Sequence, residues 1–205
     1  PAGSTASVGV FVRNSAMRFA QWGISITSLG SAAAYTLDGW KLGIGGTPAA
    51  RWTATQEAAG GVNGNDLWLK LLCTTADTSI ATTEQQFIYQ PIEGKYAQGL
   101  LNTSDDKFAG GVLSLDVIIH ADAASSISFP AQLALFLTSI DGTARTYVGQ
   151  VTITAEDIWY RVSLVISSDA TATFDNDNGE GLRIGVNLYG GTDFNTTNNT
   201  WASSA

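Results

Sequence analysis

Apolar residues recur at every second position in most segments of this chain. From residue 112 to residue 119 the odd-numbered positions are all apolar, and polar residues stand between some of them: Leu113, Leu115, Val117 and Ile119, against Ser114 and Asp116. A period of two places the apolar side chains on one face of an extended strand, whereas a helix needs a period near 3.6. Each such segment is therefore predicted to be a half-buried β-strand.

About ten segments qualify as strand candidates. They cover residues 8–13, 35–42, 50–56, 67–73, 87–92, 112–119, 133–137, 146–153, 158–166 and 182–188. The links between them hold Gly45–Gly46, Asp141–Gly142 and the run Asn176–Gly179, which suit the positive φ angles of tight turns. Helical spacing is weak everywhere. The pattern predicts an all-β fold, an antiparallel β-sandwich, with a jelly roll as the leading topology.

Charge and rare residues exclude several classes of function. Ten basic and 18 acidic residues give a net charge of −8, which disfavours nucleic acid as a partner. The single cysteine, Cys73, permits no intrachain disulfide and no cysteine zinc cluster. His120 is the single histidine. Apolar runs are only a few residues long, so no contact with a membrane is expected.

The 205 residues are enough for one domain with its own core. Residues 1–7 are small and offer nothing to bury, so residues 1–13 are predicted to form an N-terminal arm and first strand. Residues 14–205 are predicted to form the sandwich domain.

Several blocks of sequence, taken in order, resemble a family of bacteriophage tail-fibre and other virion surface proteins. The blocks are Asn14–Ser25, Tyr35–Leu42, Phe87–Gly94, Gly111–Leu115, Ile158–Arg161, Gly181–Gly191 and Phe194–Trp201. The family usually has arginine where this chain has Trp22 and Gly39, so the roles of those arginines do not carry over.

The resemblance implies a jelly roll like that of carbohydrate-binding modules, carried on the surface of a phage particle as a non-enzymatic structural or adhesive part. Other virion proteins are the implied partners, together with copies of the same chain, with a trimer as the favoured symmetry. The family continues past the Asn-Thr-Trp element into a closing strand. Because the sequence ends at Ala205, we expect an open sheet edge that a partner chain or another segment covers.

No set of catalytic residues emerges from the sequence. A serine hydrolase needs a histidine base, and His120, with Asp122 two residues on, lies at a predicted strand end without a nucleophile motif. Glycan hydrolysis needs two carboxylates facing each other across a cleft, and the glutamates are scattered along the chain. The sequence therefore predicts a protein that is not an enzyme and that needs no cofactor.

One loop is a candidate for structural calcium. Asp175, Asp177 and Glu180 place oxygen ligands around Gly179, as calcium prefers. The alternative is a polar hairpin turn in which these side chains bind their own backbone, and the absence of a helix-flanked calcium loop favours that alternative.

Aromatic residues are the remaining candidates for binding. Trp68 is out of phase with Leu67, Leu69 and Leu71 and should lie on the opposite face of its strand. Trp52, Trp68 and Tyr189 are candidate contacts for a glycan or a partner subunit, or else packing residues. Trp40 and Trp159 are expected in the core, and Cys73 is expected to be buried.

Three hypotheses follow. The first is a virion structural protein, in a tail fibre or as a fibre or decoration of the head, that acts through protein contacts and takes part in host attachment. The second is a carbohydrate-binding module for host surface glycan. The third is a secreted glycan-processing enzyme.

Overall fold

The computed structural model describes residues 12–58, 67–98, 107–122, 128–194 and 199–203. This part of the chain is built from strands, with helical turns only at α1 (Gly94–Ala97) and η2 (Thr192–Phe194). Every pair of hydrogen-bonded strands is antiparallel. The all-β fold predicted from the period-two alternation is therefore confirmed.

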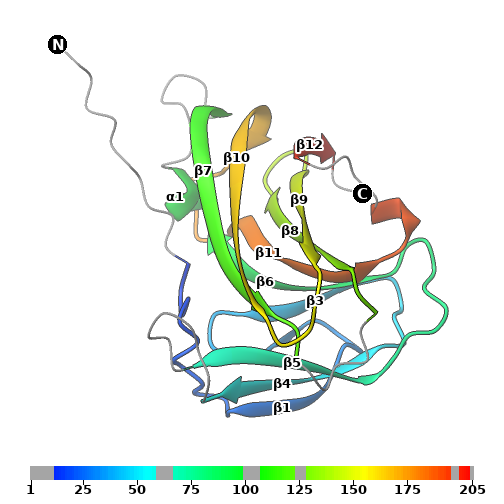
Figure 1. The fold of residues 1–205 in the computed structure, drawn as a ribbon. Coiled ribbons are helices and arrows are strands. Elements are labelled where there is room, and N and C mark those ends of the chain that lie inside the picture. The colour runs from blue at the N-terminus through cyan, green and yellow to red at the C-terminus, as the bar shows by residue number, and fades with distance from the viewer. Residues whose placement is uncertain (1–11, 59–66, 99–106, 123–127, 195–198, 204–205) are drawn as a thin grey trace.

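One layer of the molecule is a seven-stranded sheet. Its order is β12 (Thr200–Ser203), β9 (Arg145–Ile153), β8 (Ala131–Ser139), β11 (Glu180–Gly190), β6 (Gln85–Glu93), β3 (Lys41–Gly45) and β2 (Ala34–Tyr35). The sheet curves strongly, so that β8 and β9 run steeply while β6 and β11 lie nearly level in Figure 1.

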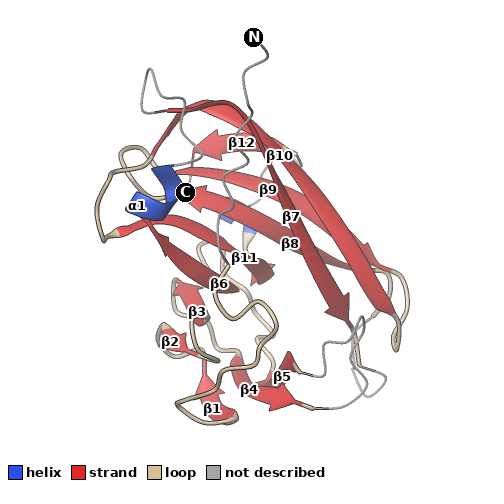
Figure 2. Ribbon diagram, turned by 90° about the vertical axis from the view of Figure 1, so that its left-hand side faces the viewer, coloured by secondary structure: helices blue, strands red, loops and turns tan. Residues whose placement is uncertain are grey.

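Two smaller sheets pack against the seven-stranded sheet. One pairs β10 (Trp159–Thr173) with β7 (Lys107–His120), and the other has the order β1 (Ser25–Leu29), β4 (Arg51–Glu57), β5 (Trp68–Thr75). Figure 2 shows β7 and β10 beside β8 and β9, with the three-stranded sheet at the lower end. The predicted antiparallel β-sandwich is therefore confirmed. The jelly-roll topology stays a prediction.

The sandwich holds two apolar cores. The first core lies between β7, β10 and the strands β6, β8, β9 and β11, and its fully buried members include Leu135, Leu137, Ile166 and Leu182. The second core lies between the three-stranded sheet and β3 and β6, around Leu42, Ala54 and Ile88. Strand β6 contributes to both cores.

The last described residues form a strand that was not among the predicted ones, and the expected cover over a sheet edge stays a prediction. Residues 200–203 form β12, which pairs with β9 from Thr200↔Val148 to Ser203↔Arg145. Trp201 anchors this strand, because its indole N–H donates to the Ser167 carbonyl at 2.7 Å and its ring packs edge-on to Tyr147. This partly buried aromatic anchor compensates for the short length of the strand.

Two predicted strand segments differ in the structure. Residues 35–42 are not one strand, because a turn with Gly39 at φ 85° separates β2 from β3, and the Trp40 N–H donates to the Leu37 carbonyl. In segment 8–13, residues 8–11 lie outside the described residues. Val12 is not in a strand, but its side chain packs against the first core. The chain is therefore already in contact with the sandwich before residue 13.

Candidate binding surfaces

The loop from Arg13 to Ile24, called the N-terminal loop below, presents large apolar side chains to solvent. Phe19 is 62% exposed, Trp22 is 80% exposed and Ile24 is 63% exposed. Arg18 in the same loop is also exposed. Three large apolar side chains exposed on one short loop are typical of a binding site, since single exposed ones are normal but several in one segment are not.

Hydrogen bonds hold the N-terminal loop in a defined shape. The Asn14 side chain donates to the carbonyls of Phe19 and Asp38 at 2.9 and 3.0 Å, and it accepts the Phe19 N–H at 3.0 Å. The Gln21 N–H donates to the Asp38 carboxylate at 3.0 Å. Asn14 adopts φ 49°, a left-handed conformation that asparagine tolerates better than most residues.

A buried glutamine fastens the start of this loop to the sandwich. Gln90 of β6 is 1% exposed, and its amide both donates to the Arg13 carbonyl and accepts the Arg13 N–H. Gln56 of β4 also donates to the Met17 carbonyl. The apolar tip is therefore preorganised, which lowers the entropic cost of binding a partner.

A second surface is the outer face of the seven-stranded sheet, which points away from both cores. The pairing register places one residue of each strand in a row across this face: Tyr35, Lys41, Tyr89, Gly185, Phe136, Val148 and Thr200. The Lys41 ammonium lies 4.7 Å from the centre of the Tyr35 ring, and the Arg183 guanidinium lies 5.1 Å from that of Tyr89.

Phe87, Tyr89 and Phe136 form an aromatic floor on this outer face. The rings of Phe87 and Phe136 meet edge-to-face at 5.5 Å. Glycines on neighbouring strands make room for them, because a Cβ at Gly43 would lie 2.4 Å from the Phe87 ring and one at Gly185 would lie 2.8 Å from the Phe136 ring. Small residues in the sheet thus leave room for the aromatic rings of neighbouring strands.

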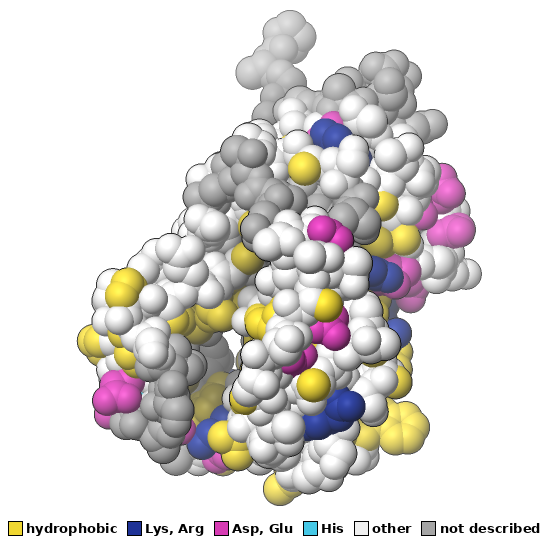
Figure 3. Space-filling view, turned by 90° about the vertical axis from the view of Figure 1, so that its right-hand side faces the viewer, with side chains coloured by type: hydrophobic (Ala, Val, Ile, Leu, Met, Phe, Trp, Pro, Cys, Tyr) yellow, Lys and Arg dark blue, Asp and Glu magenta, His cyan; other side chains and the backbone are white. Residues whose placement is uncertain are grey.

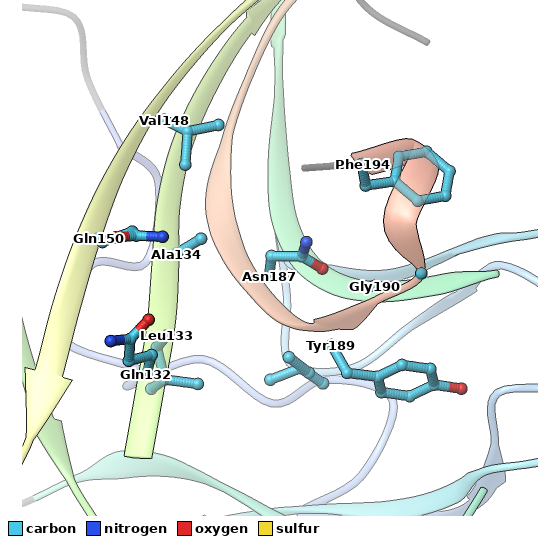
Figure 4. Close-up of a pocket in the computed structure, with 11 residues that line it drawn as sticks. Gln132, Leu133, Ala134, Val148, Gln150, Asn187, Tyr189, Gly190 and Phe194 are labelled. Atoms are coloured by element: carbon cyan, nitrogen blue, oxygen red, sulfur yellow. The ribbon is translucent and has the colours of Figure 1, made fainter. Parts of the chain in front are cut away.

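A shallow groove of about 250 Å³ lies beside this floor, where β8, β9 and β11 meet η2. Figure 4 shows side chains from all four elements around it, among them Gln132, Ala134, Gln150, Asn187, Tyr189 and Phe194. Tyr189 is the one titratable residue of the lining. The side of the molecule in Figure 3 is likewise dominated by uncharged atoms.

The Tyr189 hydroxyl remains protonated at any physiological pH. Burial, assisted by the negative charges of Asp77 and Glu84, raises the pKa of Tyr189 to about 12. The Tyr189 hydroxyl is itself buried, so the groove offers amides and aromatic rings, which suit a neutral polar ligand better than an ion.

The structure does not bring the three predicted aromatic contacts together. Tyr189 lines the groove, whereas Trp52 packs against the second core and donates its indole N–H to the buried Gln86. Of the alternatives predicted for Trp52, the structure therefore fits the packing role, because its side chain faces inward. Trp68 lies outside both cores, as its phase predicted.

Trp68 belongs to a small cluster at the end of the β7–β10 pair. Its ring meets Trp159 edge-on at 5.7 Å, and Trp159 lies 4.6 Å from the His120 ring. Trp159 was expected in the core, but it shares the outward phase of Arg161 and Ser163 along β10. His120 faces Asp157 at 3.5 Å, while Asp122 pairs with Lys70 at 2.9 Å, so His120 and Asp122 have different partners.

Cys73 was expected to be buried, and it is exposed. It has the inward phase of β5, but the second half of that strand extends beyond the core. Trp40 packs against the second core as predicted.

The predicted calcium ligands are engaged elsewhere. The Asp177 carboxylate accepts the Gly179 N–H at 2.9 Å, as in the polar-turn alternative, and Glu180 pairs with Arg183 at 2.7 Å. Asp175 is exposed. Among the described residues no group of three or more acidic, cysteine or histidine side chains could hold a metal ion.

Sequence reasoning missed both the N-terminal loop and the groove amides. The signal for Gln132 and Gln150 was present, since they occupy the polar phase of two strands whose apolar phase was recognised. For Trp22 a signal was also present. The resembled family carries arginine at this position, and arginine is mostly exposed, which indicates an exposed position.

Comparison of this chain with protein-family models, with curated proteins and with solved structures found no match. Within the described residues, no helix has both the length and the apolar character needed to cross a bilayer.

Proposed function

We propose that this chain is a structural domain of a bacteriophage particle, located at the virion surface, and that it acts through protein contacts. The observation that carries the proposal is the N-terminal loop, whose exposed Phe19, Trp22 and Ile24 stand on a hydrogen-bonded base. The ordered resemblance of residues 14–201 to virion surface proteins supports the location.

The partners in this proposal are copies of the same chain and other virion proteins. Aromatic side chains such as Trp22 and Phe19 bury roughly 150–250 Å² each on binding and are enriched at the energetic centres of interfaces. Arg18 beside them would favour an acidic partner, and a chain with net charge −8 is such a partner. The trimeric symmetry rests on the resemblance.

The test is the oligomeric state of the purified chain with Phe19 and Trp22 both replaced by serine. We expect the wild type to sediment as an oligomer at micromolar concentration and the double variant to sediment as a monomer. The thermal unfolding of the separated monomer should be intact, because both side chains are exposed. Val165→Ser removes an apolar side chain that is 61% exposed on β10, and it should leave the oligomer unchanged. A monomeric wild type would contradict the proposal.

The second candidate function is recognition of host surface glycan by the groove. The observation that favours it is the lining, in which Gln132, Gln150 and Asn187 offer amides beside the rings of Tyr189 and Phe194. Amides can hydrogen-bond sugar hydroxyls while aromatic rings pack against the apolar faces of the sugars. Because the lining is uncharged, binding should depend little on salt.

Titration with capsular polysaccharide and lipopolysaccharide from candidate hosts tests this second function. Binding that is lost in Gln150→Ala and Phe194→Ala, but retained in Val165→Ser, would support it. The same incubations test our proposal that the protein is not an enzyme, since the release of new reducing ends from the polysaccharide would indicate glycan hydrolysis. The lack of a facing carboxylate pair in the groove lining favours binding without turnover.

A further inference from the structure

An amine and a side-chain amide meet where α1 touches the turn between β10 and β11. The Lys95 Nζ donates a hydrogen bond to the Asn178 Oδ1 at 2.6 Å, across 83 positions of sequence. Two backbone bonds of 2.9 Å hold the surrounding chain in place, from the Gly94 N–H to the Gly179 carbonyl and from the Lys95 N–H to the Asp177 carbonyl. The fold therefore holds the backbone of Lys95 close to the backbone of the turn that carries Asn178.

Glycine makes this close approach sterically feasible. A Cβ at Gly94 would lie 2.1 Å from the Asp175 carbonyl oxygen, and one at Gly181 would lie 2.6 Å from the Gly94 Cα. Contacts this short do not occur, so larger residues would push α1 away from the turn.

A carboxylate completes the group. The Glu93 Oε2 lies 2.7 Å from the Lys95 Nζ, and the Tyr96 ring centre lies 4.9 Å from the same nitrogen. The side chains of Glu93 and Lys95 are 30% and 38% exposed, so the pair is partly shielded from water. A nucleophilic nitrogen, an acyl carbon and a proton acceptor thus lie within one hydrogen-bonded cluster, as nucleophilic catalysis requires.

We propose that Lys95 and Asn178 form an intramolecular isopeptide bond. Glu93 accepts a proton from the Lys95 ammonium, and the neutral Nζ attacks the Asn178 Cγ. The Nζ–Cγ bond forms, the Cγ–Nδ2 bond breaks, and the nitrogen leaves as ammonia after taking up a proton. No oxidant or reductant is required. Because the Nζ lies 2.6 Å from Oδ1 and a C=O bond is about 1.2 Å, Cγ is at most ~3.8 Å away, just beyond attack distance.

The reaction should speed up as pH rises. The hydrogen bond between the two groups, aided by their opposite charges, raises the pKa of Lys95 and holds the pKa of Glu93 below its usual range, so the amine is mostly protonated at neutral pH. Among the described residues, Arg13 and Tyr96 also act on the charges of this pair. A higher pH increases the fraction of neutral amine directly.

The competing reaction is attack on the same Cγ by the Gly179 backbone nitrogen, which gives a succinimide. The structure favours Lys95, because the Gly179 N–H is engaged with the Asp177 carboxylate at 2.9 Å. The consequence for the protein is a covalent link between the ends of β6 and β11. A chain with a single cysteine cannot make such a link as an intrachain disulfide.

The test is mass spectrometry of the full chain, incubated at pH 7 and pH 9 and sampled over time. We expect a species lighter by about 17 Da, the mass of one ammonia, which accumulates faster at pH 9. Its tryptic digest should contain one branched peptide that joins Lys95 to position 178, with no cleavage after Lys95.

Three variants make the result decisive. Lys95→Arg keeps a positive hydrogen-bond donor, and Asn178→Ser removes the amide; neither should lose the mass. Glu93→Gln should slow the reaction at pH 7 by about tenfold or more, and less at pH 9. The proposal is overturned if the wild type keeps its full mass at both pH values, or if Lys95→Arg also loses about 17 Da, which would identify the succinimide. None of these outcomes depends on the virion assignment.

Discussion

Single residues decide where side chains can lie in this sandwich. Gly43 and Gly185 stand opposite the aromatic floor, and each would collide with a ring or the backbone if it carried a Cβ. Gln86 and Gln90 are buried on β6, and each amide bonds the backbone of a different loop. A buried amide that satisfies its hydrogen bonds costs little and connects segments that are far apart in the sequence.

Gly43→Ala should destabilise the protein. The new methyl would lie 2.4 Å from the Phe87 ring, which must move off its packing against Phe136. Overpacking of this kind costs ~1–3 kcal/mol, measured as the free energy of unfolding in urea. Gly190→Ala is the control, since its methyl would approach Phe194 only to 3.3 Å and should cost less. Equal losses in the two variants would contradict the collision at Gly43.

At the scale of elements, strands β9 and β10 are joined across the sandwich by an ion pair. The Arg145 Nε donates to the Asp169 carboxylate at 2.8 Å, and Asp169 also accepts the Thr171 N–H at 2.7 Å. Burial alone would raise the pKa of Asp169, but the Thr171 N–H and the Arg145 guanidinium outweigh it and hold the pKa below its usual range. The folded state therefore favours the carboxylate form.

Acid should weaken the fold through this carboxylate. Because the folded pKa is lowered, the stabilisation is complete above the unfolded pKa of about 3.9 and is lost as pH falls through the folded pKa. Asp169→Asn should lower the free energy of unfolding at pH 7 by ~1–3 kcal/mol, since the partly buried Arg145 loses its charged partner. Denaturant titrations at pH 7 and pH 3 check this, and the variant should lose less stability over that interval than the wild type. An unchanged pH dependence would contradict it.

At the scale of the whole molecule, the two cores share strands β6 and β11, since Ile184 of β11 lies in the first core and Leu188 packs against the second. Ile92 of β6 belongs to the first core and Ile88 to the second, while β11 pairs with β6 along most of its length. Because one sheet spans both cores, unfolding of either core should also unfold the other.

Unfolding should therefore be one cooperative transition. Leu182→Ala in the first core and Leu42→Ala in the second each empty a fully buried site, and each should cost ~2–5 kcal/mol. Tryptophan fluorescence and far-ultraviolet circular dichroism should give coincident curves for the wild type and for both variants. Two separated transitions in either variant would show that the cores unfold independently.

The order of alternating residues by itself determined the fold class. Leu135 and Leu137, Val162 to Ile166, and Leu182 and Ile184 show their inward phase directly in the sequence, because a strand has only two faces and one of them must be buried. The same reasoning predicted that Trp68 lies outside the core. The phase of Trp159 is outward too, although this residue was expected in the core. Phase could not place Trp52 or Cys73, since it identifies a face and not what covers that face.

Only the tertiary structure decided which distant residues meet. Lys95 and Asn178, or the groove amides of β8, β9 and β11, are brought together by strand pairing across long stretches of chain. The exposed tip of the N-terminal loop also depends on contacts with Asp38, Gln56 and Gln90 from three other segments. Such juxtapositions arise from the register between strands, and local alternation carries no information about which strands pair.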